Sequence, residues 1–395
     1  MRQDSHILII NSGSSSIKFS LYVLGASEDL ILHGQVARIG VPPGVFQVKN
    51  HEGRPLADQE LDLPDHDAAW KTLFEWLQGH EVGRELHAVG HRLVHGGPSH
   101  VQPQRVSAAL IADLKRLIPL APDHLPHEIR GLEAVHRIFP DLVQAACFDT
   151  AFHRQMPEVA QRYALPESVA REGLQHYGFH GLSYEYLTQE LAKEAGAQEA
   201  QGRLIMAHLG NGASMAAIKN GRSVETTMGL TPTGGLVMST RSGDLDPGVL
   251  LYLLQEKGLT PDAVNYLLNH QAGLLGVSGI SGDMQDLLAR ENTDPAAALA
   301  VELFCYQARK FCGALAAVLG GLDTLIFAGG IGENAAPIRA RICTGLEFLG
   351  IQLEPVLNDQ NAPIISRPGT PVTVRVIKTN EELMIARHTR DLLPG

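Results

Sequence analysis

Three basic side chains of the sequence lie in loops made of small residues. Arg92 stands among glycines and two histidines, Arg241 lies in a loop of Gly, Ser and Thr, and Lys18 comes just after a serine-rich turn. An arginine in such a loop has few packing neighbours, so a ligand explains it better than a solvated surface position does. These positions therefore predict the recognition of a negatively charged group.

Three turns rich in glycine or serine follow short apolar runs, at residues 11–16, 208–214 and 329–334. A strand, a glycine turn and a helix in succession point backbone N–H groups and a helix N-terminus at an anion. The chain contains no Gly-Lys-Ser/Thr string of a Walker loop, and Gly329-Gly-Ile-Gly332 lacks the last glycine of the dinucleotide fingerprint. Each turn alone is equally well explained as a tight turn, but the three together favour a phosphate-rich ligand.

Two further polar residues are candidates for chemistry. Asp149 ends the apolar run 142–148, and a carboxylate at the C-terminal end of a strand is a common catalytic or metal-binding placement. His180 stands between Tyr-Gly-Phe and Gly181, where a hydrogen-bonded core histidine is the plainer alternative. We treat both residues as candidates for the site.

Composition limits the classes of protein to which the chain can belong. Its 395 residues correspond to two or three domains at roughly 150 residues each, and 44% hydrophobic residues rule out a disordered chain. A net charge of −11 makes nucleic acid and anionic membranes poor partners. The four cysteines show no disulfide or zinc spacing, and the apolar run 7–10 is too short for a signal peptide. With no run near the ~18 apolar residues of a membrane span, the sequence predicts a soluble cytoplasmic protein.

Strands and helices must position these residues. The strict alternation over 17–23 predicts a half-buried strand that forms a hairpin with the strand 7–10, whereas 40–67 is typical of irregular connections or short edge strands. Further strands are expected at 204–207, 215–218, 223–227, 324–328 and 372–377, with helices over 107–118, about 338–349 and, after a capping box at 379–382, 383–392. This alternation defines the α/β class. The weak likeness of 11–15 and 211–214 suggests two related halves.

Eight strings spread over nearly the whole chain form a set. They are Asn11-Ser-Gly-Ser-Ser-Ser-Ile-Lys18, Gly90-His-Arg-Leu-Val-His-Gly-Gly97, Phe148-Asp-Thr-Ala-Phe-His153, Tyr177-Gly-Phe-His-Gly181, His208-Leu-Gly-Asn-Gly212, 226–241, Gly330-Ile-Gly-Glu-Asn334 and Thr379-Asn-Glu-Glu382. With these strings in this order, the chain resembles the acetate kinase family, which shares a superfamily with sugar kinases, heat-shock chaperones and actin. The resemblance runs from Ile7 to about Arg387 and is far more specific than any single glycine turn.

The resemblance implies an α/β fold of two ribonuclease-H-like (actin-like ATPase) domains with mixed sheets and a cleft between them. Residues 1–149 would form the N-terminal domain, joined by the C-terminal helix at about 383–395, and residues 150–382 the nucleotide-binding domain. The implied activity is reversible transfer of the ATP γ-phosphoryl group to a short carboxylate, acetate above all, giving ADP and an acyl phosphate. Mg²⁺ is the implied metal, with Mn²⁺ as a substitute, and the implied assembly is a homodimer without nucleic acid or membrane partners.

The family's functional residues carry over to matching positions of this sequence. Carboxylate binding falls to Arg92, Val94, His124, Phe179 and Pro232, metal binding to Asn11 and Glu381, and catalysis to Asp149, His180 and Arg241. Nucleotide binding falls to Lys18, His208, Leu209, Gly210, Asn211, Gly212, Asp283, Met284, Gln285, Gly330, Ile331, Gly332, Glu333 and Asn334. In the family Asp149 is an acid–base residue, but a carboxylate with a pKa near ~4 is already ionised and needs no base. Orientation of a metal or of the transferred group is an equal alternative for Asp149.

The sequence departs from the family pattern at two places. The family usually has Leu at the position of Asp123 and Asn at the position of Leu125. A buried carboxylate beside an alkyl group is costly unless it is paired, so Asp123 pairs with His124 or His127, turns away, or contacts a polar substrate. Gln285 stands where the family generally has an arginine near the nucleotide, which leaves the contacts to base and ribose open.

Other functions stay open on the sequence alone. A kinase for propionate, butyrate or a hydroxylated short acid is the nearest alternative. A sugar kinase fits less well, because sugar hydroxyls need a true base and no arginine that clamps a carboxylate. A nucleotide-operated binding module similar to actin or the chaperones belongs to a different class and would need neither Arg92 nor His180.

Overall fold

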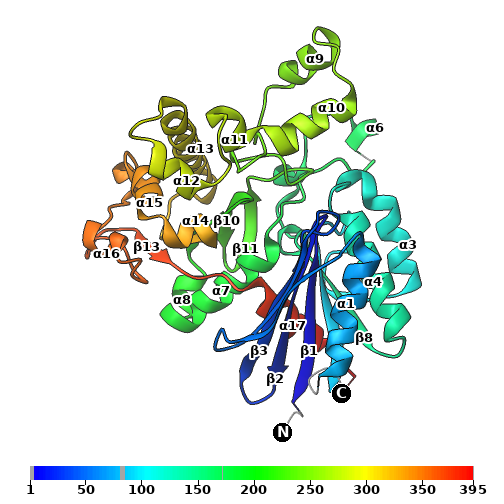
Figure 1. Ribbon diagram of the computed structural model, residues 1–395. Helices are drawn as coiled ribbons and strands as arrows, with labels where there is room; N and C mark the ends of the chain where they lie inside the picture. Colours follow the sequence, from blue (N-terminus) through cyan, green and yellow to red (C-terminus); the bar gives the residue numbers. More distant parts are fainter. Residues whose placement is uncertain (1–3, 81–84, 171, 395) are drawn as a thin grey trace. The chain divides into compact units, whose positions relative to one another are not determined.

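The computed structural model of the chain describes residues 4–80, 85–170 and 172–394. It divides into two compact units, one of residues 1–151 and 380–395 and the other of residues 152–379. Each unit is built on one β-sheet that mixes parallel and antiparallel strands, with helices packed on it (Figure 1). The expected α/β class is confirmed.

In the part of the chain described, the first unit has an eight-stranded sheet with the order β5-β4-β3-β2-β1-β6-β8-β7. Its strands are β1 Ser5–Ser12, β2 Ser16–Leu24, β3 Glu28–Ala37, β4 Gly44–Asn50, β5 Pro55–Leu61, β6 Leu86–Leu93, β7 Gln104–Arg105 and β8 Val143–Phe148. β1 and β2 form the predicted hairpin, and β1, β6 and β8 run parallel. The segment 40–67 supplies β4 and the edge strand β5.

Amphipathic helices close the core of the first unit. They are α1 His66–Gly79, α3 Ala108–Leu117, η1 Ile118–Leu120, α4 Leu125–Ile138 and α17 Glu381–Asp391. Trp70 of α1 packs in one buried cluster with Leu8 and Phe19 of the sheet, and burying an apolar side chain of this size contributes about 1.5–3 kcal/mol. The predicted start of α3 is confirmed, because the Ser107 side chain accepts a hydrogen bond from the Leu110 N–H.

The helix α17 packs on β1, β2, β6 and β8 of this sheet. It comes very close to β6 at Gly90, where an added Cβ would lie 2.4 Å from Thr389 Oγ1 and 2.6 Å from Ile385 Cγ2. Only glycine permits this approach. The glycine beside Arg92 therefore sets how closely the helix that carries Glu381 can lie on the sheet.

The residues described in the second unit form a five-stranded sheet with the order β11-β10-β9-β12-β13. Its strands are β9 Arg203–Leu209, β10 Ala213–Lys219, β11 Arg222–Thr226, β12 Thr324–Ala328 and β13 Thr373–Val376. Three antiparallel strands are followed by two parallel ones, as in β3-β2-β1-β6-β8 of the first unit. The β10–β11 hairpin turns at Asn220 and Gly221, both with positive φ as a type I′ turn requires. This common topology supports the suggestion of two related halves.

Helices of the second unit range from single turns to the long α13. They are α5 Glu158–Gln161, α6 Glu167–Ala170, α7 Gly181–Ala195, α8 Ala197–Ala200, α9 Pro247–Gln255, α10 Pro261–Tyr266, η3 Leu267–Gln271, α11 Gly273–Ser278, α12 Met284–Arg290, α13 Pro295–Leu319, α14 Gly329–Asn334, α15 Ala336–Cys343, η4 Glu347–Leu349 and α16 Pro355–Asp359, with η2 Ala151–His153 where the units join. The Asp294 side chain caps α13, and Gly320 ends it in the left-handed region. Among the described residues, no helix has both the length and the apolar character to cross a membrane.

Three local expectations are wrong. The glycine segment 329–334, expected as a turn, forms the short helix α14, and the helix expected to continue to 349 ends at Cys343 because Gly345 adopts a left-handed φ of 87°. The cap of α17 also differs from the capping box, since the side chain of Asn380 rather than that of Thr379 accepts from a helix N–H, that of Leu383. The N–H of Thr379 instead donates to Glu333 Oε1 at 3.1 Å.

Candidate active site

Arg92 is the centre of a polar cluster in the first unit. Its Nε and Nη2 donate to Oδ1 and Oδ2 of Asp149 at 3.1 and 2.6 Å, and its Nη1 donates to Asn11 Oδ1 at 3.4 Å. Glu381 Oε2 lies 3.9 Å from Arg92 Nε. These residues meet because β1, β6 and β8 are parallel neighbours whose carboxyl ends share one edge of the sheet, where α17 also begins.

The charges of this cluster compensate one another. Burial opposes the positive charge of Arg92, but Asp149 and Glu381 outweigh it and raise the pKa, so the guanidinium stays charged. The side chain of Asp149 is only 1% exposed and that of Arg92 19%. The fork of Arg92, which the family resemblance assigns to the substrate carboxylate, binds the carboxylate of Asp149 in this structure.

The other candidates of the first unit stand at the starts of two loops and on β2. Val94 is buried directly after β6, and His124 is the half-buried residue before α4. Lys18 is exposed on β2, opposite Asn11 in the register of the β1–β2 hairpin. Val94 and Lys18 therefore lie next to members of the Arg92 cluster along the chain or across the hairpin, whereas His124 belongs to the loop before α4.

Asp123, the residue that departs from the family pattern, is half-buried just before α4. Burial, with the charges of His66 and Arg130, lowers the pKa of His127, and the carboxylate of Asp123 acts in the opposite direction. Asp123 is therefore close enough to His127 to act on its charge. Leu125, the second departure, is buried as the first residue of α4.

His180 and Arg241 approach one glycine turn in the second unit. His180 precedes α7 with a φ of 56°, a strained value for a residue other than glycine. Its Nδ1 bonds to Ser214 Oγ at 2.8 Å, and its ring stacks on His208 with the centroids 4.3 Å apart. A Cβ added to Gly212 would lie 3.2 Å from His180 Nε2 and 3.7 Å from Arg241 Nη1. The absent side chain at Gly212 thus leaves room for both polar groups beside the turn.

Close backbone packing fixes the loop that carries Arg241. Arg241 Nη1 donates a hydrogen bond to the carbonyl oxygen of Pro232 at 3.2 Å. Pro232 is half-buried. A Cβ on Gly273 would lie 2.2 Å from Met238 O and 2.9 Å from Arg241 N, so glycine is required there. Pro232 and Arg241, which the resemblance assigns to substrate binding and catalysis, are therefore held against each other by one rigid loop.

The buried histidine of the string 148–153 supports the backbone beside His180. His153 Nε2 donates to Phe179 O at 3.0 Å, because a carbonyl can only accept, and its Nδ1 then accepts from Ser223 Oγ at 2.8 Å. Burial lowers the pKa of His153 to about 4, so the ring is neutral near pH 7. Phe179 itself is buried, and His153 holds its carbonyl in place.

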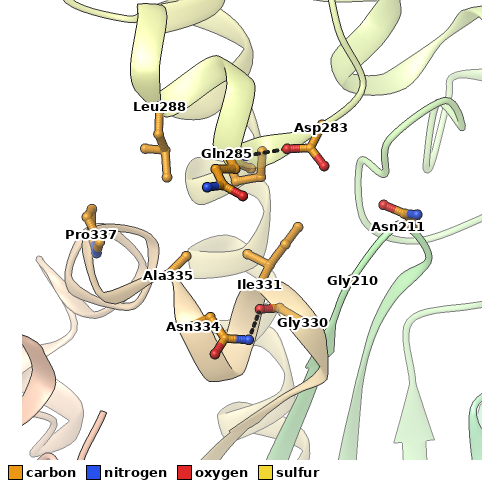
Figure 2. A pocket seen from close by; sticks show the side chains of 11 residues that line it. Gly210, Asn211, Asp283, Gln285, Leu288, Gly330, Ile331, Asn334, Ala335 and Pro337 are labelled. Carbon is orange, nitrogen blue, oxygen red and sulfur yellow. Dashed lines mark hydrogen bonds between the residues drawn. The ribbon is translucent and has the colours of Figure 1, made fainter. Parts of the chain in front are cut away.

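A cavity of about 630 Å³ lies in the second unit (Figure 2). Among the residues that the sequence assigns to the nucleotide, Gly210, Asn211, Asp283, Met284, Gln285, Gly330, Ile331 and Asn334 line it, and Leu288, Ala335 and Pro337 complete the lining. Gly210 and Gly330 come together because β9 and β12 are parallel neighbours. Backbone of glycine turns at one end and the apolar side chains of Leu288 and Ile331 suit a ligand with a flat ring and a phosphate tail.

Gln285 and Ile331 reach this cavity from two different helices, α12 and α14 (Figure 2). Asp283 is the N-cap of α12, since its Oδ1 accepts from the N–H groups of Gln285 and Asp286 at 2.7 and 3.1 Å. Asp283 therefore orients the start of the helix that carries Gln285. An amide at this position offers a donor and an acceptor, where the family's arginine offers donors only.

Five residues of the second unit that the sequence assigns to the nucleotide are not among those that line the cavity: His208, Leu209, Gly212, Gly332 and Glu333. His208 Nδ1 bonds to Ser183 Oγ at 2.8 Å, and Glu333 Oε1 accepts from Gly329 N at 2.9 Å. Leu209 is buried on β9. Hydrogen bonds of His208 and Glu333 help to hold the two glycine segments in place, and the predicted contacts of these five residues with the nucleotide stay predictions.

Sequence analysis missed two buried charged residues next to these clusters. Arg339 of α15 is fully buried, and its Nη1 donates to Gly332 O of α14 at 2.9 Å. Glu128 of α4 is buried on the helix face that also carries Leu125 and Leu132. A charge at an apolar position of a helical face was the signal that could have identified Glu128.

Comparisons with known proteins agree with this arrangement. Residues 6–387 match the acetokinase family. An acetate kinase of Rhodopseudomonas palustris (strain TIE-1) is 47% identical, over 98% of this chain and 98% of its own. The crystal structure of Porphyromonas gingivalis acetate kinase matches at a TM-score of 0.89 with 39% identity, over 99% and 100% of the two chains. The structure of a propionate kinase from Francisella tularensis subsp. tularensis SCHU S4 matches at 0.93 with 36% identity, over 98% and 100%.

The two mixed sheets of one topology, together with these structural matches, define a two-domain α/β phosphotransferase of the ribonuclease-H-like, actin-like class. The chain belongs to the acetokinase family, whose members transfer phosphoryl groups to a carboxyl group. The resemblance seen in the sequence strings is thereby confirmed, and the alternative of a binding module without enzymatic activity is set aside.

Proposed function

We propose that the protein transfers the γ-phosphoryl group of ATP reversibly to a short carboxylate, acetate first of all, giving an acyl phosphate and ADP. The observation that supports this most directly is the fork of Arg92, which already binds both oxygens of the Asp149 carboxylate. A guanidinium has five N–H donors, of which Asp149 takes two, so the rest can bind a substrate carboxylate, which presents the same kind of acceptor pair. In this proposal Arg92 binds the acid, with Val94, His124, Phe179 and Pro232 shaping the subsite.

In the second unit the cavity lined by Gly210, Gly330 and Gln285 binds the nucleotide, with Lys18 of the first unit as a further phosphate contact. His180 and Arg241 then act on the moving phosphoryl group. Its transition state is loose and spreads negative charge over three oxygens, so positioned cations lower the barrier more than covalent chemistry does. The approach of both side chains to Gly212 supports this assignment.

Asn11 and Glu381 are the residues that would hold Mg²⁺, or Mn²⁺ in its place. Both present oxygen atoms to the Arg92 cluster, and hard divalent cations prefer oxygen ligands. When bound, the ion neutralises charge on the nucleotide phosphates. Asp149 orients Arg92 and adds negative charge beside these ligands, a role that requires no proton transfer.

A polar short acid is the second candidate substrate. Asp123 stands half-buried where the family has an apolar residue, so a hydroxylated acid gains a hydrogen-bond partner that propionate or butyrate lacks. Where Asp123 pairs with His127, the subsite keeps its apolar character and acetate or propionate fits better.

The test of the proposed function is a hydroxamate assay. The protein is incubated with Mg-ATP, hydroxylamine and a panel of acetate, propionate, butyrate and hydroxylated short acids, and acyl hydroxamate is measured. We expect product with acetate, and none when ATP is omitted or when Arg241 is replaced by Ala. No product with any acid, together with ATP hydrolysis that the acids do not affect, would refute the proposal.

We also propose that the protein works as a homodimer through α9 and α10 (Figure 1). α9 buries none of its residues although most are apolar, and Leu251, Tyr252 and Tyr266 are each more than half exposed. An apolar surface of this kind marks an interaction site, and a second copy of the chain would cover it. Size-exclusion chromatography with light scattering should give twice the chain mass, and the chain mass for Leu251→Glu.

The cytoplasm is the proposed location. All four cysteines are buried, and burial raises the pKa of Cys305 and Cys312 to about 12, which suits packing residues in a reducing compartment. With a net charge of −11, the chain is expected to bind small anionic substrates through placed groups and to have neither nucleic acid nor membrane as a partner.

A further inference from the structure

Glu128 is a buried carboxyl group at the start of α4. It lies in the first turn of the helix, four residues after His124, and is 3% exposed. Its neighbours along the same helix face, Leu125 and Leu132, are fully buried. An acidic side chain at such a position costs folding free energy, because its charged form must leave water.

The carboxyl group of Glu128 joins α4 to the end of β6. Both of its oxygens accept from the Val94 N–H, at 3.2 and 3.1 Å. β6 ends at Leu93, so this N–H lies just beyond the strand ladder and takes its partner from the helix instead. Val94 follows Arg92 by two residues, and its position depends on this contact.

A second bond joins the same helical turn to the neighbouring strand. Ser12 Oγ, at the end of β1, donates to His127 O at 3.2 Å. The first turn of α4 is therefore attached to the ends of β1 and β6, the two ends that carry Asn11 and Arg92. Asp123 and His124 lie directly before this turn.

Glu128 faces the charges of the cluster as well. Burial raises its pKa to about 8, Arg92 acts in the opposite direction, and Asp149 acts in the same direction as burial. A neutral amide would make the same bond to Val94 at lower cost. What this side chain supplies is therefore the hydrogen bond to Val94, which does not require a negative charge.

We propose that Glu128 is a positioning residue of the carboxylate subsite: by holding the Val94 N–H from the first turn of α4, it fixes the backbone beside Arg92 against His124 and Asp123. This inference rests on the proposed function and adds a residue to the acid-binding side of it. Glu128 touches no reacting atom and acts through Val94.

Three variants test the inference in the full-length enzyme. Glu128→Leu removes the acceptor at similar volume, and Glu128→Gln keeps an oxygen acceptor but cannot ionise. Gln144→Leu is the matched control, since Gln144 is a buried polar residue of the same sheet whose Oε1 bonds to His91 Nε2 at 2.9 Å. KM for acetate, KM for ATP and kcat are measured for each, with the urea midpoint as the readout of stability.

We expect Glu128→Leu to raise the acetate KM about tenfold, the effect of one lost buried hydrogen bond, with the ATP KM unchanged. Glu128→Gln should restore the acetate KM to within about threefold of the wild type, on the same grounds. Gln144→Leu should lower the urea midpoint without changing either KM. An unchanged acetate KM in Glu128→Leu, or equal increases of both KM values, would overturn the inference.

Where Glu128→Leu does not fold, Glu128→Asp replaces it, because the shorter side chain withdraws the carboxylate from Val94. A folded Glu128→Asp with the acetate KM of the wild type would equally overturn the inference. Wild-type protein that makes no acyl phosphate refutes the proposed function itself. If the wild type is active but the Glu128 variants do not change the acetate KM selectively, only the role of Glu128 is refuted.

Discussion

Arg339 offers a sharp test of how the nucleotide cavity is built. All of its hydrogen bonds go to uncharged oxygens of the second unit: Nε to Asn358 Oδ1 at 2.8 Å, Nη1 to Gly332 O and Glu333 O at 2.9 and 3.0 Å, and Nη2 to Asn358 O and Asn361 Oδ1 at 2.7 and 2.6 Å. Burial lowers the pKa of this guanidinium. Arg339 thus ties the last residues of α14 to α16.

Arg339→Met keeps most of the side-chain volume but leaves these acceptors without their donor. Each unsatisfied buried acceptor costs about 1–3 kcal/mol, and removing the cation also removes its own desolvation cost. We therefore expect the free energy of unfolding to fall by about 3 kcal/mol, since several buried acceptors lose their donor at once. Because α14 carries Gly330, Ile331 and Asn334 of the cavity lining, the KM for ATP should rise about tenfold while the KM for acetate stays near that of the wild type.

Arg375→Met is the control for this prediction. Arg375 is also a buried arginine of the second unit, and it binds Glu199 through Nε and Nη2 at 2.8 and 3.1 Å. It stands on β13 and does not line the cavity, so its loss should lower the urea midpoint and leave the ATP KM unchanged. Equal ATP KM values for the two variants, whether both raised or both unchanged, would refute the reasoning.

Three further predictions concern the acid side and the chemistry. Arg241→Ala should lower kcat by about 10³–10⁵ with a modest change in KM, measured by the hydroxamate assay; a loss below tenfold would contradict its role on the phosphoryl group. Asp123→Leu should shift the preference among acids towards longer apolar chains, and an unchanged profile would show that Asp123 does not line the subsite. The pKa of Glu128 is about 8 in the folded chain, against an ordinary value of 4.5. Between these pH values the folded state binds one more proton than the unfolded state. The free energy of unfolding therefore falls as the pH rises from 4.5 to 8, by about 1 kcal/mol per pH unit. Glu128→Gln should lack this contribution, so urea midpoints at pH 6 and pH 8 should differ less in the variant than in the wild type, and equal differences would contradict the assignment.

Local patterns in the sequence were sufficient for much of the fold. The alternation of apolar and polar residues over 17–23 identified β2, because such a pattern depends on neighbouring residues only. The strand is not half-buried as expected, since Ser20 and Tyr22 are buried too and α17 packs on it. The glycine segments 210–212 and 329–334 lie far apart in the sequence, and the position of each after a strand allowed both to be assigned to one ligand. Each follows a strand, and parallel neighbours such as β9 and β12 end at the same edge.

Contacts between residues far apart in the chain explain what the sequence did not show. Nothing near Arg92 reveals that Asp149 occupies its fork, since the pairing depends on the register of β6 and β8. Thr379 does not cap α17, because its hydroxyl bonds to Ser183 Oγ at 2.8 Å and its N–H donates to Glu333, and the Asn380 side chain takes the cap. Gly329–Asn334 is helical although glycine disfavours helices, and Arg339 holds its last carbonyls.

The first unit is made of two separate stretches of the chain, residues 1–151 and 380–395, so it cannot be completed until synthesis is nearly finished. All of residues 152–379 must leave the ribosome before α17 can pack on β1, β6 and β8. Until then the nascent sheet has no cover where Ile385 and Thr389 later lie over Gly90, and Arg92 stands without Glu381 beside it. A chain stalled before residue 380 would therefore expose an apolar surface suited to capture by a chaperone.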